Sequence, residues 1–326
     1  MKKKVLITGI TGMVGSHLAD ILLKKTDWHI YGMCRWRSPL YNIDHLLDLA
    51  NKKNSRLKFI SADLNDYSSL IKTLEISRPD YIYHLAAETS TFTSELNIKK
   101  CFKTNVMGTL NLFEYCKINK PKNIIFASSM AIYGLSSKNV SEKSIPMPIS
   151  FYGLTKLNGE KILLKLKDYN INVKIFRIFN VYGVYQNYNN PHQGMLSIYL
   201  SQILRSSVVN VTGSLNRTRD FIYIDDVINA LISHKILNYK LGNIFNLGSG
   251  KEISVHYLIS TLFKITKKKY KVVIKDEHSG DTFNSCANIS LIKKTNWKIS
   301  FPLIKGINKV IKDIKYFDDN NCSFNR

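Results

Sequence analysis

The first half of the chain alternates short apolar segments with longer segments whose apolar residues recur at helical spacing. Helical patterns are clearest over residues 98–116 and 153–167. Strands that alternate with helices build a parallel sheet with helices on both faces. The sequence therefore predicts an α/β fold with a doubly wound parallel sheet. Its expected strands lie in KKVLITG, HIYGMCR, LKFISADL, DYIYHLAA, KNIIFASS and NVKIFRIFN.

The second half is more mixed, without repeats or low-complexity linkers. The stretch GNIFNLGSG reads as a further strand of the same sheet, and the part after residue 251 reads as a small α/β appendage. We therefore expect a dinucleotide-binding domain over residues 1–180, to which residues 221–250 return. A smaller mixed α/β C-terminal lobe, over residues 181–220 and 251–326, is expected to bind the substrate.

The net charge of +23 comes from lysines and arginines that are dispersed along the chain. No nucleic-acid-binding motif accompanies them, so we expect no nucleic-acid partner and a potential that steers anionic substrates. No apolar run reaches 18 residues, so no membrane span is expected. The opening MKKKVLITG reads as a first strand rather than a signal peptide, which favours a cytoplasmic protein.

The cysteines give no sign of a metal or disulfide framework. The chain has five, they are scattered, and no CxxC pair occurs among them. An odd, unpatterned set of this kind is typical neither of zinc sites nor of a disulfide scaffold. The sequence therefore predicts no metal site.

A glycine-rich turn follows the first expected strand and opens the first helix. Glycines at such a place allow a tight turn and a close backbone approach to a pyrophosphate, and the helix N-terminus adds N–H donors. The strand before and the helix after make a Rossmann-type dinucleotide site the favoured interpretation over an ordinary strand–helix turn. The expected contacts in this turn are Gly9, Thr11, Gly12, Met13 and Val14.

The end of the second strand carries Arg35 and Arg37, where an acidic residue would bind the 2′-hydroxyl of NAD. A guanidinium suits a 2′-phosphate, so the sequence favours NADP(H) over NAD as the bound NAD(P). The alternative is that both arginines lie in solvent. Asp63 ends the third strand and is expected to accept a hydrogen bond from the adenine, with a helix N-cap as the alternative.

Tyr152 and Lys156 are four residues apart in FYGLTK, so they share one face of a helix. A free tyrosine has a pKa near ~10, and a nearby ammonium is expected to lower it. The phenolate could then take a proton from a sugar hydroxyl while a hydride leaves the same carbon. Ser129, at the end of an earlier strand, could position that hydroxyl. These three residues are the candidate catalytic set.

The glycine turn, the serine-bearing strand end and the Tyr–Lys pair, in this order, resemble the extended short-chain dehydrogenase/reductase family of nucleotide-sugar epimerases and dehydratases. The resemblance runs from Lys4 to Phe317 and includes HLAA, TNVMGTLNL, RIFNVYG, RTRDFIYIDDV and FNLGSG. It implies a nucleotide-diphosphate sugar as substrate. It also implies a homodimer formed by a bundle of the helices over 98–116 and 153–167.

The resemblance further implies roles for individual residues of this chain. Arg177 would be structural or near the cofactor, and His84 would pack at a strand end, with a cofactor contact as the alternative. The remaining implied cofactor residues are Leu64, Leu85, Ala86, Ala87 and Asn105, together with Tyr152 and Lys156. The implied substrate residues are Thr89, Ser129, Met130, Asn180, Arg219 and Asp281. For Arg219, a salt bridge to a neighbouring aspartate is the alternative.

The residues after Ser129 bear on the reaction. A 4,6-dehydratase needs an added acid and base there, and dehydratases of this family carry a Glu, whereas this chain has Met130 and Ala131. A 4-epimerase that oxidises C4 transiently needs neither, so it is the favoured function. The stretch Tyr31–Leu46 resembles GDP-mannose-type dehydratases and keeps that activity and an NADPH-dependent 4-keto-sugar reductase open. A nucleotide-binding regulatory protein is the non-enzyme alternative. Polysaccharide precursors are the expected products.

Overall fold

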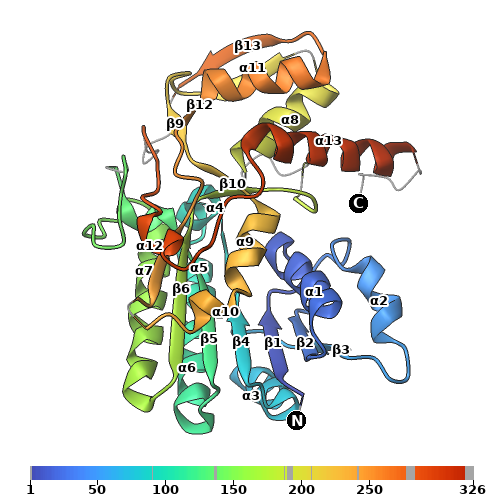
Figure 1. The fold of residues 1–326 in the computed structure, drawn as a ribbon, viewed down its shortest axis with the longest axis vertical. Helices are drawn as coiled ribbons and strands as arrows, with labels where there is room; N and C mark the ends of the chain where they lie inside the picture. The colour runs from blue at the N-terminus through green and yellow to red at the C-terminus, as the bar shows by residue number, and fades with distance from the viewer. Residues whose placement is uncertain are drawn as a thin grey trace. The chain divides into compact units, whose positions relative to one another are not determined.

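The computed structural model describes residues 2–89, 91–135, 138–186, 188, 194–206, 208–240, 242–276 and 283–319. The chain forms two compact units (Figure 1). The first comprises Met1–Ile132, Ser150–Arg177 and Leu231–Phe245, and the second comprises Tyr133–Ile149, Ile178–Ala230 and Asn246–Arg326. The boundaries of these units differ from those of the two domains expected from the sequence. Residues 133–149, 178–180, 221–230 and 246–250 were expected in the first domain but belong to the second unit.

A seven-stranded parallel sheet organises the first unit, as the sequence predicted. Its strand order is β11-β6-β5-β4-β1-β2-β3. Strands β2 and β3 are added on one side of β1 and strands β4, β5 and β6 on the other, so the order of the strands across the sheet reverses between β1 and β4. Ligands of open α/β sheets bind at the carboxyl ends of the strands beside such a reversal. The strands are β1 (Lys4–Thr8), β2 (His29–Cys34), β3 (Leu57–Ser61), β4 (Tyr81–His84), β5 (Asn123–Ser129), β6 (Asn172–Ile178) and β11 (Ile244–Leu247).

Helices connect these strands by crossovers, and their side chains form the core. Asp66 caps α3 and Ser150 caps α7, each by accepting a hydrogen bond from an amide of the first turn. The principal helices of this unit are α1 (Met13–Lys25), α2 (Asp44–Ala50), α3 (Tyr67–Ser77), α4 (Thr91–Leu96), α5 (Ile98–Phe102), α6 (Gly108–Asn119), α7 (Phe151–Leu164) and α10 (His234–Leu237).

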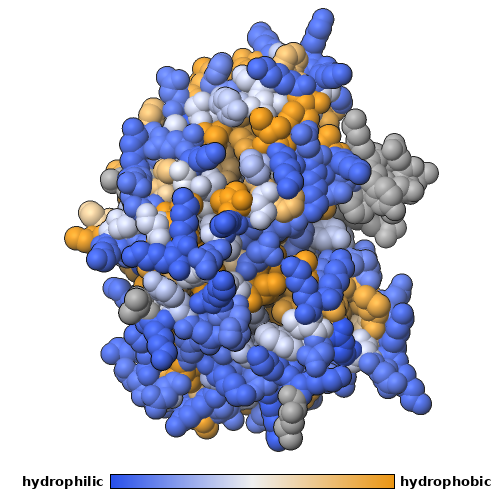
Figure 2. All heavy atoms as spheres, in the orientation of Figure 1, coloured by the Kyte–Doolittle hydropathy of each residue, from blue (hydrophilic) through white to orange (hydrophobic). Residues whose placement is uncertain are grey.

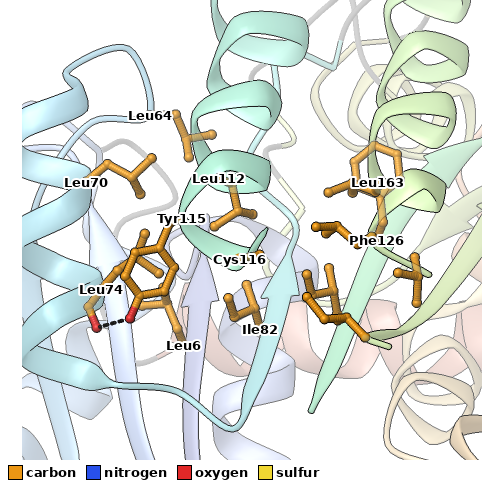
Figure 3. Close-up of a cluster of buried hydrophobic side chains, with 14 of the residues drawn as sticks. Leu6, Leu64, Leu70, Leu74, Ile82, Leu112, Tyr115, Cys116, Phe126 and Leu163 are labelled. Carbon is orange, nitrogen blue, oxygen red and sulfur yellow. Dashed lines mark hydrogen bonds between the residues drawn. The ribbon is translucent and has the colours of Figure 1, made fainter. Parts of the chain in front are cut away.

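One apolar cluster fills the space between the sheet and the helices α3, α6 and α7 (Figure 3). The Tyr115 hydroxyl donates a hydrogen bond to the backbone oxygen of Leu74 at 3.0 Å, so the one polar atom of that ring is satisfied. Burial of this cluster holds α7 against β5. Its labelled members include Leu6, Leu70, Leu112, Phe126 and Leu163.

The long helix expected over residues 98–116 is interrupted. Between α5 and α6 the chain forms a π-helical turn, Lys103–Met107, and the helical path continues to Asn119. Asn105 lies in this turn, and its side-chain amide bonds to the backbone of Glu88 and to Thr155. π-helical turns concentrate at functional sites because the extra residue redirects a side chain. The spacing of apolar residues along the sequence did not reveal this π-helical turn, because one extra residue in a turn changes the helical periodicity very little.

The second unit is a mixed α/β assembly of short elements. Strands pair in parallel between β7 (Asn180–Tyr182) and β10 (Phe221–Tyr223) and between β8 (Val208–Thr212) and β13 (Lys271–Lys275). An antiparallel pair joins β9 (Thr218–Arg219) to β12 (Ile253–Ser254). Its helices are α8 (Met195–Arg205), α9 (Ile224–Leu231), α11 (Val255–Thr266), α12 (Ser290–Lys293) and α13 (Leu303–Asp319).

On the face in Figure 2, hydrophilic side chains spread widely and small hydrophobic areas lie between them. In the part of the chain that the structure describes, we find no helix long and apolar enough to cross a membrane.

Candidate active site

The glycine turn after β1 lies directly against the loop that follows β4. Gly9 has a φ of +74°, and a Cβ at this position would sit 2.8 Å from the backbone of Ala86. The preceding residue, Thr8, accepts hydrogen bonds on its hydroxyl oxygen from the amides of Leu85 and Ala86, both at 3.2 Å. Only glycine tolerates both this conformation and this approach. The expected cofactor residues after β1 and β4 are therefore neighbours.

The N-terminus of α1 suits a phosphate group. Gly12 is its N-cap, no side chain caps the helix, and the first turn holds no acidic residue. The amides of Met13 and Val14 therefore lie at a positive helix end without a competing carboxylate. Asn42 donates to the backbone oxygen of Thr11 at 3.0 Å, while its buried side-chain oxygen has no hydrogen-bond partner among the described residues. This donor and acceptor set fits a dinucleotide.

The two arginines after β2 are engaged within the chain. The Arg35 guanidinium lies 3.6 Å from the Glu88 carboxylate, and the Arg37 guanidinium stacks 4.2 Å from the Trp36 ring centroid. Lys100 also contacts Glu88, at 3.1 Å. Arg35 is about half exposed, with 47% of its side chain accessible. Both arginines thus have side-chain partners, and both are exposed.

Asp63 does not cap a helix, since the N-cap of α3 is Asp66. One carboxylate oxygen of Asp63 accepts a hydrogen bond from the Asn65 amide at 2.9 Å. This turn leaves the carboxylate partly exposed at the end of β3. The adenine contact stays a prediction. Leu64, beside it, is buried and lies against Gly108, where a Cβ would sit 2.8 Å away.

The three candidate catalytic residues lie together in the first unit. Ser129 ends β5, and its hydroxyl forms a hydrogen bond with the Tyr152 phenol. Its oxygen also accepts from the Ala131 amide at 3.2 Å. Tyr152 and Lys156 lie on α7, and the Lys156 ammonium is 5.9 Å from the Tyr152 ring centroid. This ammonium donates to the backbone oxygen of Ala127 at 2.8 Å.

Burial controls the protonation of this pair. It raises the pKa of Tyr152 to about 12, while the hydrogen bond with Ser129 opposes the increase. Burial also lowers the pKa of Lys156 to about 8. The sequence argument expected the ammonium to lower the pKa of the phenol. Desolvation outweighs that effect here, because both groups are removed from water and Lys156 points to Ala127. At neutral pH the phenol keeps its proton and the amine keeps its charge.

A buried ion pair connects α7, the helix that carries Tyr152 and Lys156 and is called the catalytic helix below, to the sheet. Glu160, on α7, accepts hydrogen bonds from Arg177 on β6 at 2.8 and 3.0 Å and from the Ser128 hydroxyl on β5 at 2.5 Å. The side chains of Glu160 and Arg177 are 2% and 4% exposed. Of the two expected roles of Arg177, the structural one is the one seen. Glu160 was missed, although its place four residues after Lys156 puts it on the same helix face.

Asn105 supports the catalytic helix. Its side-chain nitrogen donates to Thr155 at 3.0 Å and to the Glu88 backbone oxygen at 3.0 Å, and its side-chain oxygen accepts from the Glu88 amide at 2.8 Å. Thr89, the next residue, is exposed, and Met130 is partly buried in the short 3₁₀ turn Met130–Tyr133. The roles of Thr89 and Met130 toward a substrate stay predictions.

The remaining expected substrate residues belong to the second unit. The Asn180 amide donates to the backbone oxygen of Asp220 at 3.0 Å. Arg219 is 5% exposed and donates to the backbone oxygens of Thr218 at 2.9 Å and Phe283 at 3.3 Å. Asp281, the last expected substrate residue, lies outside the described residues.

Asp220 was not singled out as functional by the sequence, yet it organises this unit. Its buried carboxylate accepts hydrogen bonds from the amides of Ser249, Gly250 and Ala287 at 2.6, 2.9 and 3.0 Å. Burial raises the pKa of this carboxyl, and these bonds oppose the increase. In the sequence, Gly250 was the one sign of a turn here, and in the structure it adopts a φ of +70° and donates its amide to Asp220.

Comparison with known proteins places the chain in one family. A family model described as the NAD dependent epimerase/dehydratase family matches residues 5–248. UDP-glucuronate 4-epimerase of Thermodesulfobacterium geofontis is 28% identical over 324 residues, which cover 94% of each protein. The structure of UDP-glucose 4-epimerase from Thermotoga maritima with UDP-glucose has a TM-score of 0.86 at 28% identity, covering 96% of this chain and 98% of that one.

A second solved relative carries both ligands. It is UDP-glucuronic acid 4-epimerase from Bacillus cereus in complex with UDP-glucuronic acid and NAD, with a TM-score of 0.84 at 31% identity, covering 97% of this chain and 100% of that one. The family model spans most of the chain, including the glycine turn and the Ser–Tyr–Lys set. The chain therefore belongs to the NAD dependent epimerase/dehydratase family.

Proposed function

We propose that this chain is a nucleotide-sugar 4-epimerase that acts on a UDP-hexose with bound NAD. The observation that carries the proposal is the Ser129–Tyr152 hydrogen bond beside Lys156, at the carboxyl edge of a sheet whose glycine turn suits a dinucleotide. The solved relatives that are UDP-sugar 4-epimerases, bound to UDP-glucose or to UDP-glucuronic acid and NAD, support the same reaction class.

The chain's own residues provide acid–base chemistry at the sugar O4. When bound, the oxidised nicotinamide supplies a hydride acceptor and a positive charge. Ser129 holds the C4 hydroxyl. In the loaded site, the positive charge beside Tyr152 would favour its phenolate, which takes the proton of that hydroxyl as C4 is oxidised. After the 4-keto sugar has turned over, Tyr152 returns the proton to O4 as C4 is reduced from its other face. The charge of Lys156 stabilises the phenolate while Tyr152 lacks its proton.

Elimination of water is disfavoured at this site. Met130 and Ala131, which follow Ser129, cannot exchange protons. Two carboxylates near Tyr152 in the first unit are committed elsewhere. Glu160 is bound by Arg177, and Glu95 accepts a hydrogen bond from the Phe151 amide at 2.6 Å. A dehydratase needs an acid and a base beyond the tyrosine, so these contacts support an epimerase.

A substrate panel tests the proposed function. The purified chain is incubated with NAD and with UDP-glucose, UDP-galactose, UDP-glucuronic acid or UDP-N-acetylglucosamine, without a reductant. A C4 epimer of unchanged mass supports the proposal. A product lighter by one water identifies a dehydratase, and turnover only with NADPH and a 4-keto sugar identifies a reductase.

For the diphosphate of the nucleotide sugar, we propose contacts from Asn180 and Arg219.

We also propose that the preferred cofactor is NAD. The sequence favoured NADP(H) because of Arg35, but the Glu88 carboxylate lies 3.6 Å from this guanidinium and offsets its charge. A 2′-phosphate would have to compete with that carboxylate. The structure of the Bacillus cereus relative contains NAD, and so does that of UDP-glucose 4-epimerase from Thermus thermophilus. These points support NAD over the phosphorylated form.

Titration checks this preference. We expect the chain to bind NAD at least about tenfold more tightly than NADP, and Glu88→Gln to raise NADP affinity relative to NAD by roughly two- to fivefold, the value of a partly exposed ion pair. Glu114→Gln, which removes a separate surface pair with Lys117, should leave the ratio unchanged. Tighter binding of NADP by the unmodified chain would restore the preference that the sequence favoured.

A homodimer is the proposed assembly. Phe102 and Met107 lie one π-helical turn apart, and both are 41% exposed. Leu154, on the adjacent α7, is 42% exposed, and Ile98, one turn before Phe102, is 46% exposed. Large apolar side chains gathered on two neighbouring helices are typical of a helix-bundle interface. This supports the bundle that the resemblance implied.

Light scattering after size-exclusion chromatography checks the assembly. The unmodified chain should elute with twice the mass of one chain, and Phe102→Glu should give monomers at micromolar concentration, because a buried charge opposes association. Ile76→Glu, at a 52% exposed position on α3, should leave the dimer intact. A monomeric unmodified chain would contradict the proposal. A cytoplasmic location and a place in polysaccharide biosynthesis stay predictions of the sequence.

A further inference from the structure

A continuous chain of buried hydrogen bonds runs through His84, at the end of β4. The ring Nδ1 lies 3.0 Å from the Thr8 hydroxyl, and the ring Nε2 lies 2.9 Å from the Thr109 hydroxyl on α6. Thr109 donates in turn to the backbone oxygen of Asn105 at 2.7 Å. His84, Thr8 and Thr109 are at most 1% exposed. Because these groups are buried from water, their hydrogen-bond partners are the neighbouring protein groups, and these partners decide which atom donates in each bond.

The protons can be assigned from the partners. The Thr109 hydroxyl donates its one proton to Asn105, so toward His84 it acts as an acceptor. The ring must therefore carry its proton on Nε2 and accept on Nδ1. Thr8 then donates to Nδ1, while its oxygen accepts from the amides of Leu85 and Ala86. Burial lowers the pKa of His84 to about 3, and the charge of Lys156 adds to this, so the ring stays neutral.

Both ends of the chain reach the active site. At one end, Thr8 precedes Gly9, the first residue of the glycine turn. At the other end, Asn105 donates to the Thr155 hydroxyl at 3.0 Å, and Thr155 donates to the backbone oxygen of Tyr152 at 2.8 Å. The proposed cofactor turn and the helix that carries the tyrosine are thereby joined through the side chains of His84, Thr109 and Thr155 and through both the backbone and the side chain of Asn105.

The His84 ring has a second contact with the catalytic helix. It stacks on Phe126 with ring centroids 5.4 Å apart and an interplanar angle of 22°. The Lys156 ammonium also contacts Phe126, at 4.9 Å from the ring centroid. A Cβ at Gly159 would sit 2.8 Å from Phe126, so α7 packs as closely as its backbone allows. A displacement of the His84 ring would therefore also shift Phe126 and the position of the Lys156 ammonium.

We propose that His84, as the neutral Nε2–H tautomer held between Thr8 and Thr109, is a positioning residue that sets the spacing between the glycine turn and Tyr152. Hydride transfer and proton transfer at C4 require the cofactor and the phenol to meet one sugar carbon at the same time. Misplacement by about 1 Å can lower a rate by roughly 10²-fold. The inference rests on the proposed epimerase function for its kinetic consequence, but not for the tautomer.

Kinetic measurements on isosteric variants test the positioning role. Thr109→Val removes the hydroxyl and should lower kcat for epimerisation by roughly 10- to 100-fold. The KM for the UDP-sugar and the Kd for NAD should stay within about threefold, since Thr109 would touch neither ligand. Thr109→Ser retains the hydroxyl and should keep kcat within about threefold of the unmodified chain. A kcat of Thr109→Val equal to that of Thr109→Ser overturns the proposal.

Two further variants separate positioning from general packing. Thr73→Val removes a buried hydroxyl that bonds only to the Ser69 backbone oxygen at 2.9 Å, on α3, and should leave kcat unchanged. His84→Phe keeps the stacking on Phe126 but breaks both hydrogen bonds. The double variant His84→Phe/Thr109→Val should lose little more than the worse single variant, because one break already interrupts the chain. Fully multiplicative losses overturn the proposal.

The tautomer is tested without turnover. A long-range ¹H–¹⁵N spectrum of histidine-labelled protein, with His84 assigned by its loss in His84→Phe, should show a neutral Nε2–H ring that does not titrate between pH 5 and 8. An Nδ1–H tautomer or a titrating ring overturns the inference even if the chain is an active epimerase. An inactive substrate panel combined with the expected spectrum and a tightly bound NAD rejects the proposed function and leaves the assigned tautomer standing.

Discussion

Tyr152→Phe should lower kcat for C4 epimerisation by roughly 10²- to 10⁴-fold, the range that general acid–base groups contribute. The change removes only the phenolic oxygen, which carries the proton and the hydrogen bond with Ser129. The ring stays in its packed position on α7, so the UDP-sugar should still bind within a few-fold of its original Kd. Turnover measured by coupled assay or NMR, with binding by calorimetry, checks the expectation.

A matched variant controls for loss of any buried phenol. Tyr115→Phe removes a hydroxyl that bonds to the Leu74 backbone oxygen at 3.0 Å, away from Ser129 and Lys156. It should cost about 1 kcal/mol of stability and leave kcat unchanged. If Tyr152→Phe turns over at a rate similar to Tyr115→Phe, Tyr152 is not the acid–base group.

Glu160→Gln should destabilise the chain by about 3–5 kcal/mol, because it leaves the buried Arg177 guanidinium without a counter-charge. The carboxylate accepts from Arg177 at 2.8 and 3.0 Å and from Ser128, and the two charged side chains are 4% exposed or less. Chemical denaturation measures the free energy of unfolding. A fall in Tm of about 6 °C or more should accompany it.

An exposed pair and a double variant complete this test. Asp168→Asn breaks a pair with Lys165 whose side chains are 70% and 75% exposed, and should change stability by no more than about 0.5 kcal/mol. Replacing both partners in Glu160→Leu/Arg177→Met should recover much of the loss, because no buried charge is left unpaired. A Glu160→Gln variant as stable as Asp168→Asn would contradict the role assigned to the pair.

Local patterns were sufficient for the fold. Alternating strands and helices predicted the parallel sheet, and the glycine turn predicted a dinucleotide site after the first strand. Both predictions depend on periodicity and backbone freedom, which neighbours along the chain impose. Ser129, Tyr152 and Lys156 could be proposed as candidates for the same reason, since the tyrosine and lysine share a helix face and the serine ends a strand. These three residues lie close together because Ser129 is at the carboxyl end of β5 and α7, which carries Tyr152 and Lys156, packs beside that strand.

Other features depended on residues far apart in the sequence. The Arg35 guanidinium favoured NADP(H) when read alone, but Glu88, from the loop after β4, lies beside it. The helix over 98–116 appeared continuous in its pattern, whereas Asn105 bonds to Glu88 and Thr155 through a π-helical turn. No window of a single element contains such partners.

The sequence by itself determined the α/β class, the glycine turn and the candidate residues for acid–base chemistry, since these need only local spacing. The tertiary structure decided their protonation and their rigidity. Burial, which no residue reveals on its own, keeps the phenol of Tyr152 protonated and His84 neutral. The partners of Glu160 and His84 come from strands and helices up to 76 residues away, because folding, and not spacing along the chain, brings them together.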